Sequence, residues 1–146
     1  MRCFVQTYLN APAGVVWTAV KKPRTLLHVT RGFLGFSGSD HFPPEWSLGG
    51  KVETRLWFFH ILPGWKHTLT VAEVNEDGKL IRSHEFSAFY TWDHIIRVRE
   101  ESSGCGYSDE IEIRAGLLTF FIWLFANVFY RYRQMRWRKL AQSLNQ

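Results

Sequence analysis

The sequence predicts an α+β fold, in which a strongly curved antiparallel sheet of about six strands wraps around a long C-terminal helix. A β-prone segment, Arg2 to Asn10, leads into a proline that stands where a helix would begin. Five further β-prone segments, separated by turn residues, lie between residues 52 and 114. From Leu117 to about Leu144 the chain has no proline or glycine, and apolar residues recur at helical spacing.

Two short helices are expected after the first strand. The first extends from about Pro12 to Lys22, because proline is favoured at the start of a helix, and Pro23 ends it. A second is expected near residues 25–30. The stretch from Gly32 to Gly50 is rich in glycine and proline, and we interpret it as a connection.

The remaining segments are expected to form a meander of five strands. These strands are 52–59, 66–75, 79–87, 91–101 and 106–114, with Pro63-Gly64 and Asp77-Gly78 among the turns. In the last strand apolar and polar residues alternate, which indicates one buried and one solvated face. The predicted inward residues of the last two strands are Trp92, His94, Ile96, Val98, Tyr107, Asp109, Ile111 and Ile113.

Composition is consistent with one globular domain over residues 1–146. The chain is 46% hydrophobic and 16% aromatic, with seven tryptophans. Aromatic residues at this density must fill a large core or line a pocket. Cys3 and Cys105 are the two cysteines, and the chain begins without the apolar core of a signal peptide. We therefore expect free thiols and a cytoplasmic location.

The order of the elements resembles the helix-grip fold of the START-like (SRPBCC) superfamily, which includes lipid-transfer START domains, hormone carriers and polyketide cyclases. N-A-P-A-G-V-V-W at 10–17 resembles the superfamily's A-P-x-x-V-W/F entry into the first helix. F-S-A-F-Y-T-W-D-H at 86–94, followed by Y-S-D-E at 107–110, is similar to the G-P-F-x-x-W-x-H and (T/S)-D-x-(V/I) strands of a bacterial group labelled polyketide cyclase/dehydrase. Ser87 and Ala88 replace the glycine and proline of that pattern. Ile96 replaces a second histidine, so a role that needs two histidines is not carried over.

The resemblance implies a ligand cavity between the sheet and the C-terminal helix. On the helix, Phe121 and Leu124 are expected to face the sheet, together with Phe125 and Val128. Trp46 belongs to the Gly32–Gly50 connection, which would lie near the mouth of the pocket, where it could gate the entrance or cap the core. The candidate ligand-binding residues are Trp46, Trp92, His94, Tyr107, Asp109, Phe121 and Leu124.

His94 and Asp109 are also the candidate catalytic residues if the protein is an enzyme. An inward imidazole needs a hydrogen-bond partner, and an inward carboxylate must pair, meet water or carry a shifted pKa. A turn at Ser103-Gly104 would set Asp109 opposite Val98 and His94 opposite Ile113. The two side chains would then lie about 13 Å apart, which argues against a direct hydrogen bond between them.

No metal or cofactor is expected. The six histidines show no ligand spacing supported by cysteine, and no Walker loop, dinucleotide fingerprint or G-x-S-x-G motif occurs. His67 and His84 could meet in the pocket if their strands pair suitably, although exposure at the sheet edge is the simpler expectation.

The C-terminal helix carries more bulky apolar residues than one buried stripe can hide. A second copy of the chain could cover the surplus, or an anionic membrane could contact the aromatic residues while basic side chains bind phosphates. The basic residues in question are Arg131, Arg133, Arg136, Arg138 and Lys139. They could equally form a solvated helix face. Nucleic acid is not expected, since no binding module is recognised.

The sequence thus leads to three hypotheses. The first is binding of a hydrophobic small molecule, such as a lipid, an isoprenoid or an aromatic polyketide, without chemistry on it. The second is a cyclase or dehydratase in which His94 is the general base and Asp109 or Tyr107 the acid or positioning group. The third is a peripheral membrane or protein-interaction module.

Overall fold

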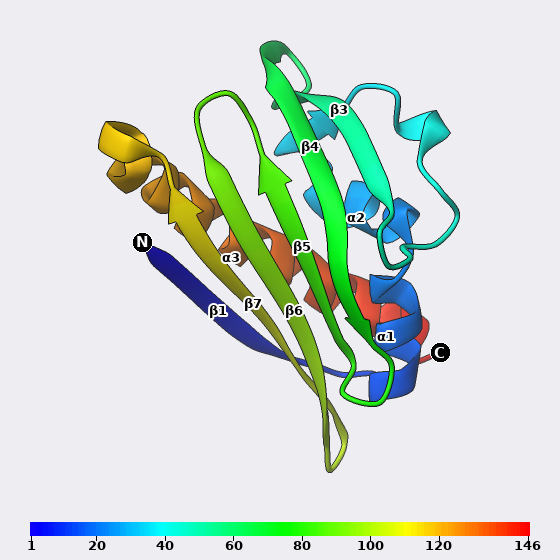
Figure 1. The fold of residues 1–146 in the computed structure, drawn as a ribbon. Coiled ribbons are helices and arrows are strands. Elements are labelled where there is room, and N and C mark those ends of the chain that lie inside the picture. The colour runs from blue at the N-terminus through cyan, green and yellow to red at the C-terminus, as the bar shows by residue number, and fades with distance from the viewer.

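The computed structural model describes residues 1–146, which form seven strands and three α-helices (Figure 1). In chain order the elements are β1 (Arg2–Leu9), α1 (Ala13–Val20), α2 (Pro23–Thr30), β2 (Leu34–Phe36), β3 (Lys51–Phe58), β4 (Leu62–Asn75), β5 (Leu80–Phe86), β6 (Thr91–Glu101), β7 (Gly104–Arg114) and α3 (Thr119–Leu144). Short 3-10 helices occupy Ser39–His41 and Gly116–Leu118. The predicted α+β class and the order of the predicted elements are confirmed.

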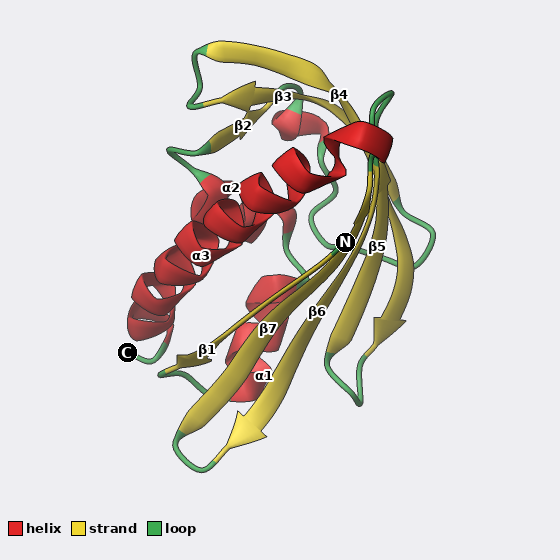
Figure 2. Ribbon diagram, turned by 90° about the vertical axis from the view of Figure 1, so that its left-hand side faces the viewer, coloured by secondary structure: helices red, strands yellow, loops and turns green.

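All seven strands belong to one antiparallel sheet in the order β1-β7-β6-β5-β4-β3-β2. Only β1 departs from the meander order, because it pairs with β7 at the far edge. The sheet curls so that its concave face receives α3, and α1 and α2 lie on the same side (Figure 2). This is the sheet wrapped around a C-terminal helix that the sequence predicts.

The sheet has one strand more than expected. Residues Leu34–Phe36 pair with Leu56–Phe58, although they lie within the stretch interpreted as a connection. Three residues, of which the middle one is Gly35, are too few to show the alternation of a strand. Pro63-Gly64, predicted as a turn, lies inside β4, and the turn falls at residues 59–61, where Phe59 and His60 have positive φ.

The hairpin of β6 and β7 turns earlier than predicted. Glu101 pairs with Gly104, so the turn consists of Ser102 and Ser103 alone. The register is therefore shifted by two residues, and Asp109 lies opposite Ile96 instead of Val98. Gly104 fits this position because a Cβ there would lie 2.4 Å from the Leu9 carbonyl oxygen of β1.

Helix α3 presents a different face to the sheet from the one predicted. Its first half is apolar nearly all round, so hydrophobicity alone does not define the buried side. Phe121, Leu124 and Val128, expected to face the sheet, are exposed, whereas Phe125 packs against Phe58 of β3 as predicted. The buried residues of α3 are Ala126, Phe129, Tyr130, Arg133, Gln134, Trp137 and Ala141.

The core has two parts along α3. One contains Leu9, Val16, Val98, Tyr107 and Trp137, near α1, and the other gathers around Ile111, Ile113, Phe129 and Tyr130. Both cysteines are buried and unpaired. None of the helices combines the length and the apolar character needed to cross a membrane.

Candidate functional site

A cavity of about 280 Å³ lies between the concave face of the sheet, α2 and α3. Of its 30 lining residues, 23 are hydrophobic, so most of its wall suits an apolar ligand. The Gly32–Gly50 connection supplies Leu34, Phe36, Phe42 and Trp46 to the lining. Whether that segment opens as a gate stays a prediction.

The predicted ligand-binding residues are distributed unevenly around this cavity. Trp46, Trp92 and His94 line it, and so does Phe121, although 66% of Phe121 is exposed. Tyr107 and Asp109 point inward from the sheet but lie behind the cavity wall, where His94 and Arg133 cover them. Leu124 is 49% exposed and is not part of the lining, because the buried stripe of α3 lies on another side of the helix.

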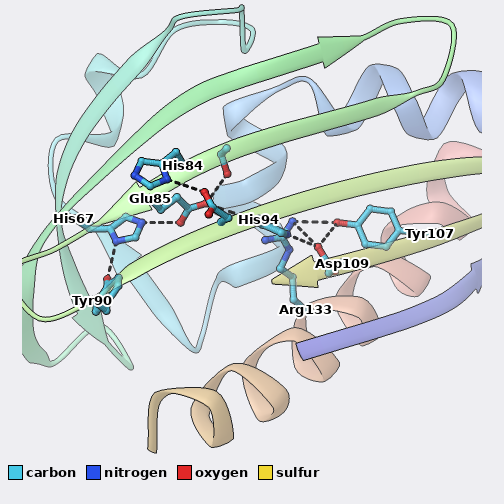
Figure 3. A network of polar contacts seen from close by, with 10 residues as sticks. His67, His84, Glu85, Tyr90, His94, Tyr107, Asp109 and Arg133 are labelled. Atoms are coloured by element: carbon cyan, nitrogen blue, oxygen red, sulfur yellow. Dashed lines mark hydrogen bonds and ion pairs between the residues drawn. The ribbon is translucent and has the colours of Figure 1, made fainter. Parts of the chain in front are cut away.

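One wall of the cavity is formed by a continuous set of buried polar contacts (Figure 3). At its β4 end, His67 Nδ1 lies 2.7 Å from the Tyr90 hydroxyl. Trp65 Nε1 donates a hydrogen bond to the same hydroxyl. His67 Nε2 lies 2.8 Å from Glu85 Oε2, and Ser83 donates to Glu85 Oε1. Glu85 is therefore held by donors on both oxygens.

His94 joins this first group to a second one on β7 and α3. Its Nδ1 lies 3.6 Å from Glu85 Oε1, and its Nε2 lies 2.8 Å from Asp109 Oδ1. The prediction that His94 and Asp109 do not touch is therefore wrong. The turn at Ser102-Ser103, one residue earlier than predicted, brings them to diagonal positions on neighbouring strands, one pair apart along the sheet instead of two.

Asp109 is the centre of the second group. Tyr107 donates to its Oδ1 over 3.3 Å, Gln134 donates to its Oδ2 over 2.9 Å, and Arg133 Nη2 lies 3.6 Å from Oδ1. Arg133 also donates to the Tyr107 hydroxyl. Two residues of α3 thus fix the carboxylate from the helix side while His94 fixes it from the sheet.

The two buried carboxylates of this network lie beside three basic side chains, those of His67, His94 and Arg133. Burial favours neutral carboxyl groups, but hydrogen bonds from His67 and His94 outweigh it and lower the pKa of Glu85. The Arg133 charge and the His94 hydrogen bond likewise outweigh burial and lower the pKa of Asp109. Burial opposes charge on His94 too, yet its contacts with Asp109 and Glu85 raise its pKa. The two carboxylates are thus stabilised by the Arg133 guanidinium and by hydrogen bonds to the imidazoles of His67 and His94.

Alternation along the strands explains why these groups meet. Ile81, Ser83 and Glu85 share the inner face of β5, and Ser83 pairs with His94 on β6. On β4, His67 shares its face with Leu69 and Val71. Period-two spacing from these apolar neighbours is the signal that could have placed Glu85 and His67 inside.

The role of Arg133 was missed because it lies in a run of basic residues. It is only 5% exposed, and it follows Phe129 and Tyr130 and precedes Trp137 at helical spacing. That spacing places Arg133 on the buried stripe, so it cannot contact a membrane as proposed for the basic run. Arg131, Arg136 and Arg138 form intramolecular hydrogen bonds, to Asn127, the His28 carbonyl and Thr7.

The sheet places His67 and His84 on opposite faces, and His67 is buried instead of exposed at a sheet edge. His84 lies on the outer face, 2.7 Å from Asp93, whereas His67 faces the cavity, so these two residues do not meet. No group of three or more His, Cys, Asp or Glu side chains is arranged to hold a metal ion.

Comparisons of sequence find no matching family model and no matching curated protein. Comparison of structures does find proteins of similar fold. A protein from Chromobacterium violaceum has a TM-score of 0.74 at 15% identity, with 96% of each chain covered. A protein from Nitrosomonas europaea has a TM-score of 0.76 at 12% identity, covering 98% of this chain and 95% of the other.

A named enzyme is among the similar structures. Norcoclaurine synthase from Thalictrum flavum, in complex with dopamine and hydroxybenzaldehyde, has a TM-score of 0.69 at 12% identity, covering 98% of this chain and 87% of the enzyme. Likeness at such identity concerns the fold alone. Together with the curled sheet and the long C-terminal helix, it shows that this chain has the START-like helix-grip fold.

Proposed function

We propose that the protein binds a hydrophobic small molecule in the cavity between the sheet and α3. The observation that carries this proposal is the lining, which is hydrophobic at 23 of 30 residues and gathers its charged side chains and histidines on one wall. Specific small-molecule sites combine these two features, since apolar surface supplies affinity and a few fixed polar groups orient the ligand.

The size of the cavity narrows the class of ligand. At about 280 Å³ it lies just below the usual range of roughly 300–1,000 Å³ for such sites. A molecule of one or two aromatic rings, or a short isoprenoid, fits this volume better than a lipid with two long chains. The structurally similar norcoclaurine synthase holds dopamine and hydroxybenzaldehyde, which are molecules of the smaller kind.

Two measurements test the proposal. Native mass spectrometry of freshly purified protein should detect a retained small molecule. In a fluorescence titration, the probe 1-anilino-8-naphthalenesulfonate should show saturable binding at one site.

Val71→Trp should abolish probe binding because it fills the cavity from β4. Ala72→Trp, on the exposed side of the same strand, is the matched control and should bind normally. Equal binding by both variants would place the probe elsewhere and contradict the proposal.

Catalysis on the bound molecule is a second candidate function, favoured by the polar wall. The general base and acid first considered, His94 and Asp109 or Tyr107, are poorly placed for it. Both nitrogens of His94 face carboxylates, and Asp109 and Tyr107 lie behind the wall. His67 and Tyr90 line the cavity themselves and are oriented by Glu85 and Trp65, so acid–base chemistry would fall to them.

His67→Gln separates the two functions. The molecule found by native mass spectrometry would be incubated with wild-type protein and with the variant, and products followed by liquid chromatography and mass spectrometry. A binding protein leaves the molecule unchanged and loses only affinity in the variant. An enzyme converts it, and the variant loses turnover by about 100-fold or more.

A further inference from the structure

The hydrogen bonds at the β4 end of the polar wall have one consistent direction. Trp65 Nε1 can only donate, so the Tyr90 hydroxyl oxygen is its acceptor. The Tyr90 proton needs an acceptor of its own, and His67 Nδ1 lies 2.7 Å away. The neutral His67 ring then carries its proton on Nε2, which faces Glu85 Oε2 over 2.8 Å. Donation thus passes from Tyr90 through His67 to Glu85 (Figure 3).

The other protonation forms of His67 leave a buried group without a partner. A proton on Nδ1 alone would set the bare Nε2 against the Glu85 carboxylate, so that two acceptors would face each other. Protons on both nitrogens would give the Tyr90 oxygen a second donor, and its own proton would then have no acceptor in the protein. Only the form protonated at Nε2 satisfies every group.

Glu85, where these hydrogen bonds end, is also the carboxylate that faces the cavity. Its side chain is 9% exposed and lines the cavity, whereas that of Asp109 is 0% exposed and lies behind the wall. A carboxylate offers about four acceptor positions, and Glu85 uses one for Ser83 and one for His67. His94 Nδ1 is farther away, 3.6 Å from Oε1. Glu85 therefore keeps acceptor positions for a molecule in the cavity.

This end of the wall offers no matching donor. Ser83, His67 and Tyr90 line the cavity as well, but each already gives its proton to a neighbour within the wall. Both nitrogens of His94 face carboxylates. A polar group of the ligand that meets this end therefore has to be a donor.

The rest of the lining favours an uncharged donor. Because 23 of the 30 lining residues are hydrophobic, moving an ammonium group out of water into this cavity costs far more than moving a hydroxyl group. Resting on the proposed function, we propose that the ligand is an apolar molecule with a hydroxyl group that donates a hydrogen bond to Glu85.

Three probes of one skeleton test this inference at pH 7.5 by displacement of 1-anilino-8-naphthalenesulfonate. They are 2-naphthol, its isostere 2-methylnaphthalene, and 2-naphthylmethylamine, which is an ammonium ion at this pH. The ratio of the affinities for 2-naphthol and 2-methylnaphthalene should fall at least about tenfold from wild-type protein to Glu85→Gln. In this variant the single amide oxygen stays with His67, and the amide nitrogen can only donate.

Glu112→Gln is the matched control, because Glu112 is an exposed glutamate on the outer face of the same sheet. It should keep the affinity ratio of wild-type protein. A second readout needs no variant. The long-wavelength absorption band of 2-naphthol should move to longer wavelength on binding to wild-type protein, because donation to a carboxylate shifts electron density onto the phenolic oxygen. The band of 2-methylnaphthalene should not move.

The direction of donation is tested separately, on wild-type protein labelled with ¹⁵N in its histidine rings. In long-range ¹H–¹⁵N correlation spectra, His67 should show a protonated Nε2 and a bare Nδ1. Its signals are identified by their loss in His67→Gln. A proton on Nδ1 would overturn the inference, because Tyr90 could then turn its own proton toward the cavity.

The binding results separate this inference from the proposed function. The same affinity ratio in wild-type protein and in Glu85→Gln, or an unshifted band of bound 2-naphthol, overturns the inference but leaves the binding function intact. Tighter binding of the amine than of 2-naphthol overturns the assignment of an uncharged group. If neither the naphthalenes nor the fluorescent probe bind, the proposed function fails and the inference fails with it.

Discussion

His94 lies between two acidic side chains and connects both halves of the polar wall. Each of its ring nitrogens faces a carboxylate, Glu85 on one side and Asp109 on the other. Both nitrogens can donate only when the ring is protonated. The geometry therefore favours an imidazolium with a structural and electrostatic role, in which the charge of His94 offsets one of the two buried carboxylates.

The stability of the protein should consequently depend on pH through His94. Its pKa is raised in the folded state, so the stabilisation is fully present below the usual histidine pKa of 6.5 and is lost as the pH rises through the folded pKa. The free energy of unfolding in urea should thus fall as the pH increases above about 6.5. His94→Gln should flatten this dependence, whereas His84→Gln, on the outer face, should retain it. An unchanged slope in His94→Gln would assign the effect to another group.

Asp109 should be the most sensitive polar residue of the network. Asp109→Asn leaves Arg133 and His94 without their shared anion, and breaking a buried ion pair in this way costs about 3–5 kcal/mol. The matched control is Asp93→Asn, which removes a partly exposed partner of His84 and should cost less than about 1 kcal/mol. Chemical denaturation measures both. A similar loss of unfolding free energy in the two variants would mean that the charge of Asp109 does not stabilise the network.

At the scale of elements, the sequence predicts the faces of strands better than their register. Alternation in β7 correctly turns Tyr107, Asp109 and Ile111 inward. Register depends on which residues form the turn, and Ser102-Ser103 and Ser103-Gly104 are both acceptable turns locally. The close approach of Gly104 to β1, a contact distant in sequence, favours Ser102-Ser103 as the turn. The resulting two-residue shift in register separates a hydrogen-bonded His94–Asp109 pair from one about 13 Å apart.

The rotation of α3 was predicted wrongly for a related reason. In its first half nearly every position is apolar, so hydrophobic periodicity does not define a buried side. The buried side is determined instead by packing against the sheet. Phe129, Arg133 and Trp137 share the buried stripe, and an arginine in that stripe is recognised only when its partner Asp109 is known. The buried polar network is therefore the part of the site that local sequence patterns define least.

The orientation of α3 leads to a direct test by truncation. Phe129→Ala should cost about 3–5 kcal/mol of stability, because it empties a buried volume beside Phe33 and Tyr130. Leu124→Ala should cost less than about 1 kcal/mol, because its side chain is half exposed. Thermal and urea unfolding of the two variants provide the comparison. A reversed order would mean that the helix is rotated toward the face first predicted from the sequence.

For the whole molecule, the predicted class, element order and wrapped sheet are those of the structure, because they follow from periodicity, turns and chain order. What remains to be explained is the outer face of α3. Its first half exposes Phe120, Phe121, Leu124 and Val128, and Leu117 in the preceding 3-10 helix is exposed as well. Contiguous apolar surface of this kind indicates a contact with another molecule.

We expect that second molecule to be another copy of the chain. A membrane would draw on the basic run for phosphate contacts, and that run is weakened because Arg133 is buried and Arg131, Arg136 and Arg138 donate hydrogen bonds within the protein, which leaves only Lys139 without such a contact. Sedimentation equilibrium should show a concentration-dependent dimer, and Phe121→Ser with Leu124→Ser should make the protein monomeric. Lys22→Ser with Lys139→Ser, which removes charge but no apolar surface, is the control and should still dimerise. A monomeric wild type that binds vesicles of phosphatidylglycerol through the same two α3 residues would assign this face to a membrane instead.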